Sequence, residues 1–209
     1  EGDDGLFTQG SPVIFATADQ SCVIVWGDQR SGSRSIFSQK LNPEGESQWE
    51  ENGVQLFEGM DYSTSYHQIH SIGHGEFVIT WLDGRHQRNT IPYIQYCTSD
   101  VERIMNTEFS TNGIPVIEPN ENSAREAFSF VSEDNSTILV WEDSRRGQQS
   151  IYAQRISQQG ERLWGEAGIL CVESENRGEK LPYACTDGNG GFIVAWREDT
   201  NNTFTNIHS

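Results

Sequence analysis

The stretch Cys22-Val-Ile-Val-Trp26-Gly-Asp28-Gln-Arg30 occurs four times along the chain in related forms. The other copies are Phe77-Val-Ile-Thr-Trp81-Leu-Asp83-Gly-Arg85, Ile138-Leu-Val-Trp141-Glu-Asp143-Ser-Arg145 and Phe192-Ile-Val-Ala-Trp196-Arg-Glu198-Asp-Thr200. Successive tryptophans are 55, 60 and 55 residues apart. A period of this length indicates a repeat architecture, in which each repeat forms one structural unit.

The similarity extends beyond the tryptophan motif. Each of the first three repeats continues with a second apolar stretch, which begins at Ile36, Pro92 or Ile151. An aromatic residue then stands four positions before a glycine, in the pairs Trp49/Gly53, Phe109/Gly113 and Trp164/Gly168. The repeats span approximately residues 11–60, 61–120, 121–175 and 176–209, and the fourth is incomplete. We assign all of them to one domain, residues 1–209.

The repeat is made of short β-strands. Runs of β-branched and aromatic residues alternate with turns rich in Gly, Asp, Asn and Ser, which is typical of hairpins. The strand that ends at Trp26 is apolar at every position from Val23 onward, so both of its faces should be buried. About four strands per repeat without helical periodicity predict an all-β fold, a β-propeller with one blade per repeat. A β-solenoid and a string of small sandwiches are the alternatives, and their repeat lengths fit less well.

The fourth repeat lacks its last strand, and the segment that begins at Glu1 does not supply one in the sequence pattern. Either the chain is part of a larger propeller or a strand comes from another chain, and we prefer the larger propeller. The sequence begins without an initiator Met or a signal peptide, which indicates a processed or excised chain.

The composition is strongly acidic. The 209 residues include 31 Asp and Glu but only 14 Lys and Arg, a formal net charge of −17. Such a charge repels nucleic acid and anionic membranes, so neither is expected as a partner. No segment has the length of apolar residues that a membrane-spanning helix needs.

The four cysteines occupy positions that are apolar in the sister repeats. We therefore expect buried free thiols. A disulfide between Cys171 and Cys185, which lie on neighbouring blades, is the alternative. The cysteines are Cys22, Cys97, Cys171 and Cys185.

Metal and catalytic motifs are missing from the sequence. The second repeat contains four histidines, but their spacing does not bring them to one face, so no metal site or cofactor is expected. These histidines are His67, His70, His74 and His86. Neither a nucleophile elbow nor a phosphate-binding glycine loop is present. We therefore expect a protein that is not an enzyme.

The recurring Trp-x-Asp-x-Arg motif is the strongest candidate for a special role. The Asp can accept backbone N–H bonds in the turn, and the Arg can pair with the Asp or lie on an aromatic ring. Because the motif recurs, we expect it to stabilise each blade. The motif residues are Trp26, Asp28, Arg30, Trp81, Asp83, Arg85, Trp141, Asp143, Arg145 and Trp196. The functional alternative is that Arg30, Arg85 and Arg145 line one face and recognise carboxylates, such as those of acidic glycans.

The third repeat resembles a repeat of large secreted and surface proteins of bacteria. The resemblance rests on Val140-Trp-Glu-Asp-Ser-Arg-Arg-Gly-Gln-Gln-Ser-Ile-Tyr-Ala-Gln-Arg-Ile and on Gly160-Glu-Arg-Leu-Trp164-Gly-Glu-Ala-Gly168-Ile. It covers nearly the whole chain and implies a propeller in an extracellular, often adhesive or structural, multidomain protein. The resemblance implies a location and an architecture but no activity.

Together these features predict a non-catalytic extracellular or cell-surface module with structural or interaction roles. Its partners would be a protein or a glycan at the cell surface. An open blade edge could also join protomers into a homo-oligomer or a filament by strand addition. The alternative is a carbohydrate-binding propeller of a surface or secreted protein, and a propeller glycoside hydrolase or lyase ranks third.

Overall fold

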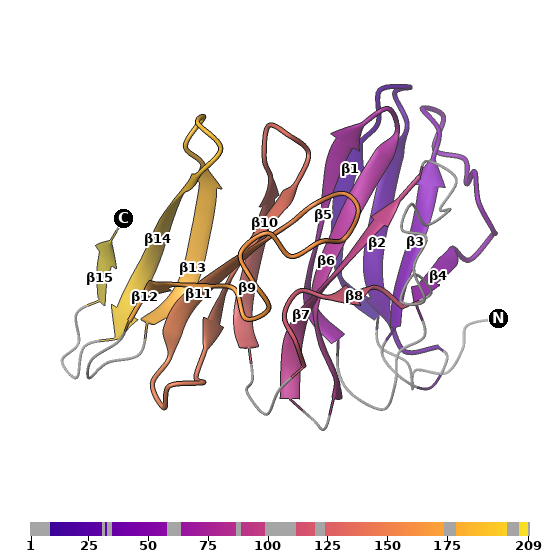
Figure 1. Cartoon of the computed structure of the whole chain (residues 1–209). Coiled ribbons are helices and arrows are strands. Elements are labelled where there is room, and N and C mark those ends of the chain that lie inside the picture. Colours follow the sequence, from indigo (N-terminus) through magenta and orange to yellow (C-terminus); the bar gives the residue numbers. More distant parts are fainter. Residues whose placement is uncertain are drawn as a thin grey trace.

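The computed structural model describes residues 9–30, 32, 35–57, 64–86, 89–98, 112–119, 124–173, 179–199 and 205–208. The regular structure in these residues consists of β-strands in four antiparallel sheets, which stand side by side in chain order (Figure 1). Within the described ranges we find no helix with the length and hydropathy needed to cross a membrane.

Each sheet corresponds to one repeat of the sequence. The first contains β1 (Gln9–Ala16), β2 (Cys22–Asp28), β3 (Ser35–Leu41) and β4 (Val54–Phe57). The second contains β5 (Thr64–Gly73), β6 (Glu76–His86), β7 (Asn89–Cys97) and β8 (Ile114–Pro115). The third contains β9 (Ala124–Val131), β10 (Thr137–Asp143), β11 (Ser150–Ile156) and β12 (Ile169–Val172). The fourth contains β13 (Glu179–Thr186), β14 (Phe192–Asp199) and β15 (Thr205–His208).

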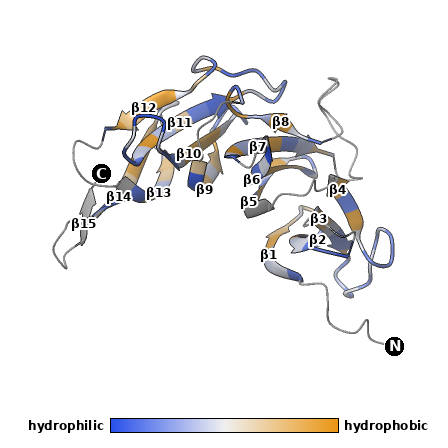
Figure 2. Ribbon diagram, turned by 90° about the horizontal axis from the view of Figure 1, so that it is seen from below, coloured by the Kyte–Doolittle hydropathy of each residue, from blue (hydrophilic) through white to orange (hydrophobic). Residues whose placement is uncertain are grey.

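The four sheets fan out around a common axis. In every sheet the strands pair in chain order, so the first strand of each repeat lies at one edge. These first strands, β1, β5, β9 and β13, contact one another in sequence, and they line the inside of the arc in Figure 2. Radial antiparallel sheets that meet at their first strands form a β-propeller, so the predicted fold is confirmed.

The strand register is the same in all four sheets. The inner strands pair with the tryptophan strands through Val13–Val25, Gln68–Thr80, Phe128–Val140 and Tyr183–Ala195. A β-bulge precedes each of these pairs. Ser11, Glu126 and Leu181 have positive φ values in these bulges, and a bulge of this kind turns the following side chains to a new direction.

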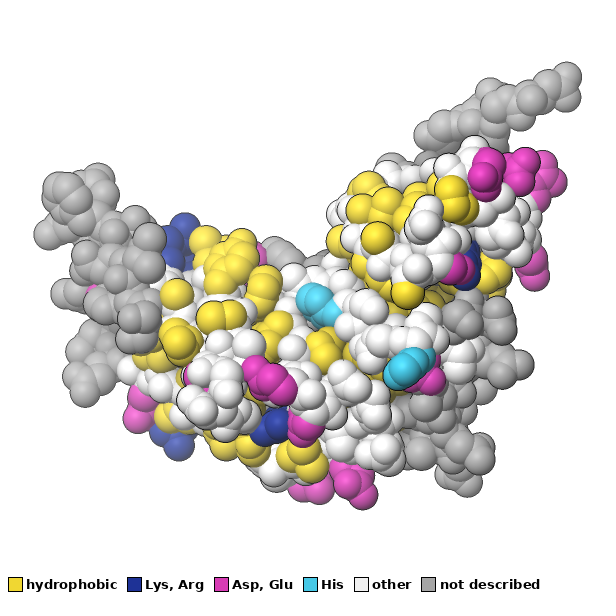
Figure 3. All heavy atoms as spheres, turned by 90° about the horizontal axis from the view of Figure 1, so that it is seen from above, with side chains coloured by type: hydrophobic (Ala, Val, Ile, Leu, Met, Phe, Trp, Pro, Cys, Tyr) yellow, Lys and Arg dark blue, Asp and Glu magenta, His cyan; other side chains and the backbone are white. Residues whose placement is uncertain are grey.

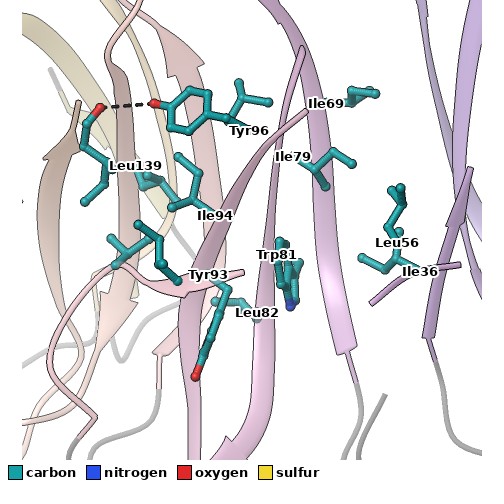
Figure 4. Packing of buried hydrophobic residues seen from close by; sticks show 14 of the residues in the cluster. Ile36, Leu56, Ile69, Ile79, Trp81, Leu82, Tyr93, Ile94, Tyr96 and Leu139 are labelled. Atoms are coloured by element: carbon teal, nitrogen blue, oxygen red, sulfur yellow. Dashed lines mark hydrogen bonds between the residues drawn. The ribbon is translucent and has the colours of Figure 1, made fainter. Parts of the chain in front are cut away.

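The core lies between the sheets. Val78, Ile79 and Trp81 are almost completely buried although they point to opposite faces of β6, as the apolar pattern predicts. Figure 4 shows Ile79 and Trp81 between the first and second sheets. On the other face, Tyr96 reaches the third sheet and donates a hydrogen bond to the carbonyl of Ile156 at 3.2 Å.

A glycine contacts the tryptophan ring in each of the first three blades. Gly53, Gly113 and Gly168 have φ values of 82°, 70° and 70°. A Cβ atom on Gly113 would lie 2.3 Å from Cη2 of Trp81, which is far inside van der Waals contact. The glycine of each aromatic–glycine pair in the sequence is therefore the residue at which the backbone passes directly over the indole ring, where a side chain would not fit.

The expectation of four buried cysteines is wrong for one of them. All four are free thiols, but Cys185 is exposed, while Cys22 and Cys171 are half-buried. Cys185 pairs with Ile193, so both point to the outward face of the fourth sheet. No described sheet packs on that face, and Ile193 is accordingly 52% exposed.

Gly113→Ala should destabilise the protein by about 3–4 kcal/mol. The alanine would have to adopt the left-handed backbone conformation of Gly113, and its methyl group would overlap with the ring of Trp81. Gly147→Ala is the matched control, since Gly147 has a φ of 90° with open space around it. It should cost only about 1–2 kcal/mol. Urea denaturation of both variants measures the difference, and equal losses would contradict the role of the ring contact.

Candidate functional site

The motif residues form a compact cluster at the end of the tryptophan strand in each of the first three blades. In the second blade, Asp83 accepts hydrogen bonds from Trp81 Nε1 at 2.9 Å and from the backbone N–H of Arg85 at 2.9 Å. The Arg85 guanidinium pairs with the same carboxylate at 2.5 Å. It also lies 4.4 Å from the ring centroid of Tyr93, which stacks on Trp81. The four side chains therefore hold one another in place.

The first and third blades contain the same cluster. Asp28 accepts from Trp26 Nε1 at 3.0 Å, and Asp143 accepts from Trp141 Nε1 at 3.1 Å. The arginines pair with these carboxylates and lie over Phe37 and Tyr152. In both blades the guanidinium also donates to a backbone carbonyl, of Asn52 at 2.7 Å and of Ala167 at 2.8 Å. In the fourth repeat, Glu198 stands at the Asp position.

Arg30, Arg85 and Arg145 thus contact their own blades through charge, hydrogen bonds and ring stacking. Their side chains are 32%, 12% and 13% exposed. These contacts show that each arginine stabilises its own blade. Recognition of a ligand carboxylate by the same arginines stays a prediction. Burial alone would raise the pKa of Asp83, but the hydrogen bonds and charge of Arg85 outweigh it and lower that pKa.

A different set of residues lines the inside of the arc. The slot after each bulge holds Val13, Gln68, Phe128 or Tyr183, one from each inner strand, and we call these four residues the inner row. Val13, Gln68 and Phe128 are half-buried, while Tyr183 is 62% exposed. Tyr183 lies two residues before Cys185 and therefore shares with Cys185 and Ile193 the outward face of the fourth sheet, which no described sheet covers, and this accounts for its exposure.

The inner row is connected to a polar network between the second and third blades. The hydroxyl of Ser129 lies 2.9 Å from His70 Nε2 and 2.7 Å from Thr80 Oγ1. Gln68 Oε1 accepts from the backbone N–H of Ser129 at 2.6 Å and from its hydroxyl at 3.0 Å. Since the single hydroxyl proton of Ser129 goes to Gln68, His70 and Thr80 are left to donate to its oxygen. Each of the four side chains has a partner.

Burial lowers the pKa of His70 below its ordinary value of 6.5, so the imidazole is neutral at pH 7. Among the residues that the structure describes, no three His, Cys, Asp or Glu side chains gather as metal ligands would. His67 is buried on the same strand, whereas the side chain of His86 lies outside the described set.

An aromatic pair continues the inner row toward the fourth blade. The ring centroids of Phe128 and Tyr183 are 5.1 Å apart, with the planes tilted by 51°. Figure 3 shows apolar and histidine side chains around the hollow between the first sheet, on the right, and the fourth sheet, on the left. The exposed ring of Tyr183 belongs to the strand that borders this hollow on the inside of the arc.

One buried carboxylate lies beside the inner strands. Glu142, on β10, is only 3% exposed and accepts a hydrogen bond from the backbone N–H of Leu181 at 2.8 Å. Burial raises its pKa, and the nearby charge of Glu126 adds to this effect. Lys180 and Arg125 act in the opposite direction. A buried carboxyl with a raised pKa is a feature of general acids as well as of structural contacts.

The sequence alone carries a signal for these residues, but the motif search missed it. At the aligned slots, Gln68, His70, Thr80 and Ser129 replace residues that are mostly apolar in the sister repeats, and Glu142 replaces Gly27, Leu82 and Arg197. The structure brings four of them into one network, because neighbouring blades pack inner strand against inner strand.

No protein-family model matches the chain, and no curated protein matches its sequence. Solved structures do share its fold. An endo-arabinase from Bacteroides thetaiotaomicron has a TM-score of 0.52 and 10% identity, over 94% of this chain and 72% of the arabinase. A thermostable family-43 glycoside hydrolase has a TM-score of 0.50 and 13% identity, over 95% and 70%. A polysaccharide lyase has a TM-score of 0.50 and 9% identity, over 91% of this chain and 55% of the lyase.

These neighbours correct one prediction. The absence of catalytic motifs led to the expectation of a protein that is not an enzyme, and this expectation is wrong by comparison with three structures that are all named as enzymes. At 9–13% identity the likeness establishes the fold. The physical reason for the error is that propeller sites are assembled from single residues on different blades, which leave no local motif.

Asp83→Asn should cost about 3 kcal/mol at neutral pH, because it leaves the buried Arg85 without a counter-charge. The lowered pKa of Asp83 means that its contribution is present above the ordinary carboxyl pKa and is lost as the pH falls through the folded-state value. Thermal denaturation of both proteins between neutral and acidic pH should show their stabilities converging in acid. A constant difference across this range would contradict the assignment.

His70→Gln should flatten the pH dependence of stability below pH about 6.5, the ordinary pKa of histidine. In the native protein the lowered pKa of His70 lets the unfolded chain bind a proton that the folded chain excludes, so stability falls as the pH drops through this window. Glutamine can still donate to Ser129 but does not titrate. Chemical denaturation at several pH values measures both slopes, and identical slopes would show that His70 does not couple to folding.

Proposed function

We propose that this chain is a carbohydrate-active β-propeller that binds a glycan along the inner row, in an extracellular or cell-surface setting. The observation that carries the proposal is the pair of aromatic rings of Phe128 and Tyr183 on the adjacent inner strands β9 and β13, of which Tyr183 is 62% exposed. The names of the three structural neighbours support it, since each acts on carbohydrate. Assembly into a homo-oligomer or a filament, and binding of a protein partner, stay predictions of the sequence.

The chemistry of the inner row suits a sugar. Aromatic rings present a flat apolar surface, and Tyr183 adds a hydroxyl that can donate and accept. On the inner strand β5, Gln68 and His70 are half-buried, and their hydrogen bonds to Ser129 fix the orientation of both side chains. Pockets that combine aromatic walls with a few oriented polar groups are typical of small-molecule and cofactor sites.

Tyr183→Ala should weaken glycan binding by roughly tenfold, the change that about 1.4 kcal/mol produces. Isothermal titration against a panel of soluble plant and bacterial polysaccharides, with arabinan included, measures the affinity. Leu163→Ala is the matched control, because Leu163 is 46% exposed in a loop of the third blade, away from the inner strands. Binding that is unchanged in the Tyr183 variant, or lost equally in both, would contradict the assigned site.

Cleavage of the bound glycan is a second candidate, which the raised pKa of Glu142 favours. A carboxyl whose pKa is raised keeps its proton to a higher pH than an ordinary carboxyl, and a protonated carboxyl can protonate a leaving oxygen, as the acid of a glycoside hydrolase does. Its hydrogen bond to Leu181 fixes the side chain at the junction of the third and fourth blades. Glu126, the neighbouring carboxylate whose charge helps to raise the pKa of Glu142, lies in the bulge of β9.

Glu142→Gln should lower any hydrolytic activity by on the order of a hundredfold or more, since glutamine has no proton to transfer. It retains an acceptor for the Leu181 N–H, so glycan affinity and thermal stability should change little. Release of reducing ends from the polysaccharides that bind is the measurement. Retained activity in this variant would exclude Glu142 as the acid and leave it as a contact between blades.

A further inference from the structure

We infer that two copies of this chain dock head to tail, with the fourth sheet of one copy packed face to face on the first sheet of the other. These two sheets form the ends of the arc in Figure 2. Each of them has an apolar face exposed to solvent, and the two faces are the two halves of the contact that joins neighbouring blades within the chain. The assembly therefore uses the faces of sheets, in contrast to strand addition at an open edge.

The fourth sheet exposes one half of this contact. Ile193 on β14 is 52% exposed, and Cys185, its partner on β13, is exposed as well. In the other three sheets the slot of Ile193 holds Val23, Val78 and Ile138, which are completely buried. This slot packs on the next blade in the first three sheets, whereas in the fourth sheet it faces solvent. A contiguous apolar surface of this kind is typical of an interaction site.

The first sheet exposes the other half. Ile14 on β1 is 63% exposed, and Ile24, its partner on β2, is half-buried. Ile69 and Ser129 hold the slot of Ile14 in the next two sheets, and both are buried. The slot of Ile24 in the second sheet holds Ile79, which is buried too. The face that the preceding blade covers in the second and third sheets is thus exposed in the first.

Within the chain these two kinds of face pack on each other. Phe15 lies on the same face as Val23, and its ring centroid is 5.7 Å from that of Phe77 on the facing side of the second sheet. His70 contacts Ser129 in the same way between the second and third sheets. The fourth sheet of one copy and the first sheet of another present the same two surfaces in the same strand register.

A second copy is the partner that these surfaces fit, because one chain carries both halves of a single contact. Such an interface is heterologous, since different patches of the two copies meet. Four sheets from each of two copies give a ring of eight blades, a number within the range that propellers form. Where the rotation between copies does not close a ring, the same interface builds a filament.

Docking leaves the inside of the arc accessible. Gln68 and Phe128 hold the slot of Tyr183 in the second and third sheets, and both stay half-buried although the next blade covers their sheet. A second copy should therefore bury Ile193 and Cys185 more completely than Tyr183. Assembly and glycan binding are then compatible and can be tested separately.

Sedimentation velocity over a range of protein concentrations tests the assembly. The native chain should form dimers or larger species, and Ile14→Lys and Ile193→Lys should each be monomeric, because each places a charge in the interface. An equimolar mixture of the two variants should recover a dimer, since the first sheet of one and the fourth sheet of the other are unchanged. Leu163→Lys adds the same charge in an exposed loop and should assemble like the native chain. A native chain that stays monomeric, or variants that do not complement each other, would overturn the inference.

Cysteine crosslinking locates the interface. Phe15 and Phe77 hold the slots of Cys185 and Cys22, so their contact predicts that Cys185 of one copy lies near Cys22 of the next. A short thiol-to-thiol crosslinker should join this pair between copies, as mass spectrometry of the digested dimer would show. Cys185→Ser should abolish the covalent dimer, and Cys97→Ser, at a buried position, should not. A dimer linked through Cys185 of both copies would contradict the head-to-tail arrangement.

Discussion

The contact on which the rest of this structure depends is the tryptophan–aspartate–arginine cluster at the end of the tryptophan strand in each of the first three blades. The indole N–H, the backbone N–H and the guanidinium all bind one buried carboxylate. These bonds compensate for the cost of burying its charge and hold the side chain in one position. The arginine then covers the aromatic ring of the next strand, and the indole rests on a glycine. Three strands and the following loop are thereby joined in every complete blade, which explains why the spacing of these residues repeats.

Because each of these blades is stabilised by its own cluster, the side chains of the inner strands contribute less to the stability of their own blade. Their side chains contact the neighbouring blade and the axis, and there the repeat is broken. Ser129 meets His70 and Thr80 where sister blades place mostly apolar residues. A fully bonded polar network of this kind specifies which blade packs on which. Scaffold and candidate site are thus separated along the radius of the blade.

The same separation explains the likeness to an arabinase, a glycoside hydrolase and a lyase at 9–13% identity. A propeller is maintained by contacts between strands and sheets, which many apolar residues can make, so its sequence can drift widely. Its chemistry depends on a few side chains at the axis. A sequence motif consists of residues close together in the chain, so it reveals the cluster but not the residues that different blades contribute at the axis. For this reason the sequence alone led to the expectation of a protein that is not an enzyme.

The sequence by itself determined the fold class and the number of repeats, because a blade is a local unit whose hairpins and apolar strands are formed by consecutive residues. It also marked Gly113 and Asp83 as positions with a repeated task. Only the tertiary structure decided that Gln68, His70, Thr80 and Ser129 meet, and that Cys185 is exposed. These outcomes depend on which faces of two blades pack together and on which face of the last sheet remains uncovered. Such contacts join residues up to 61 positions apart, a separation at which no local pattern records proximity.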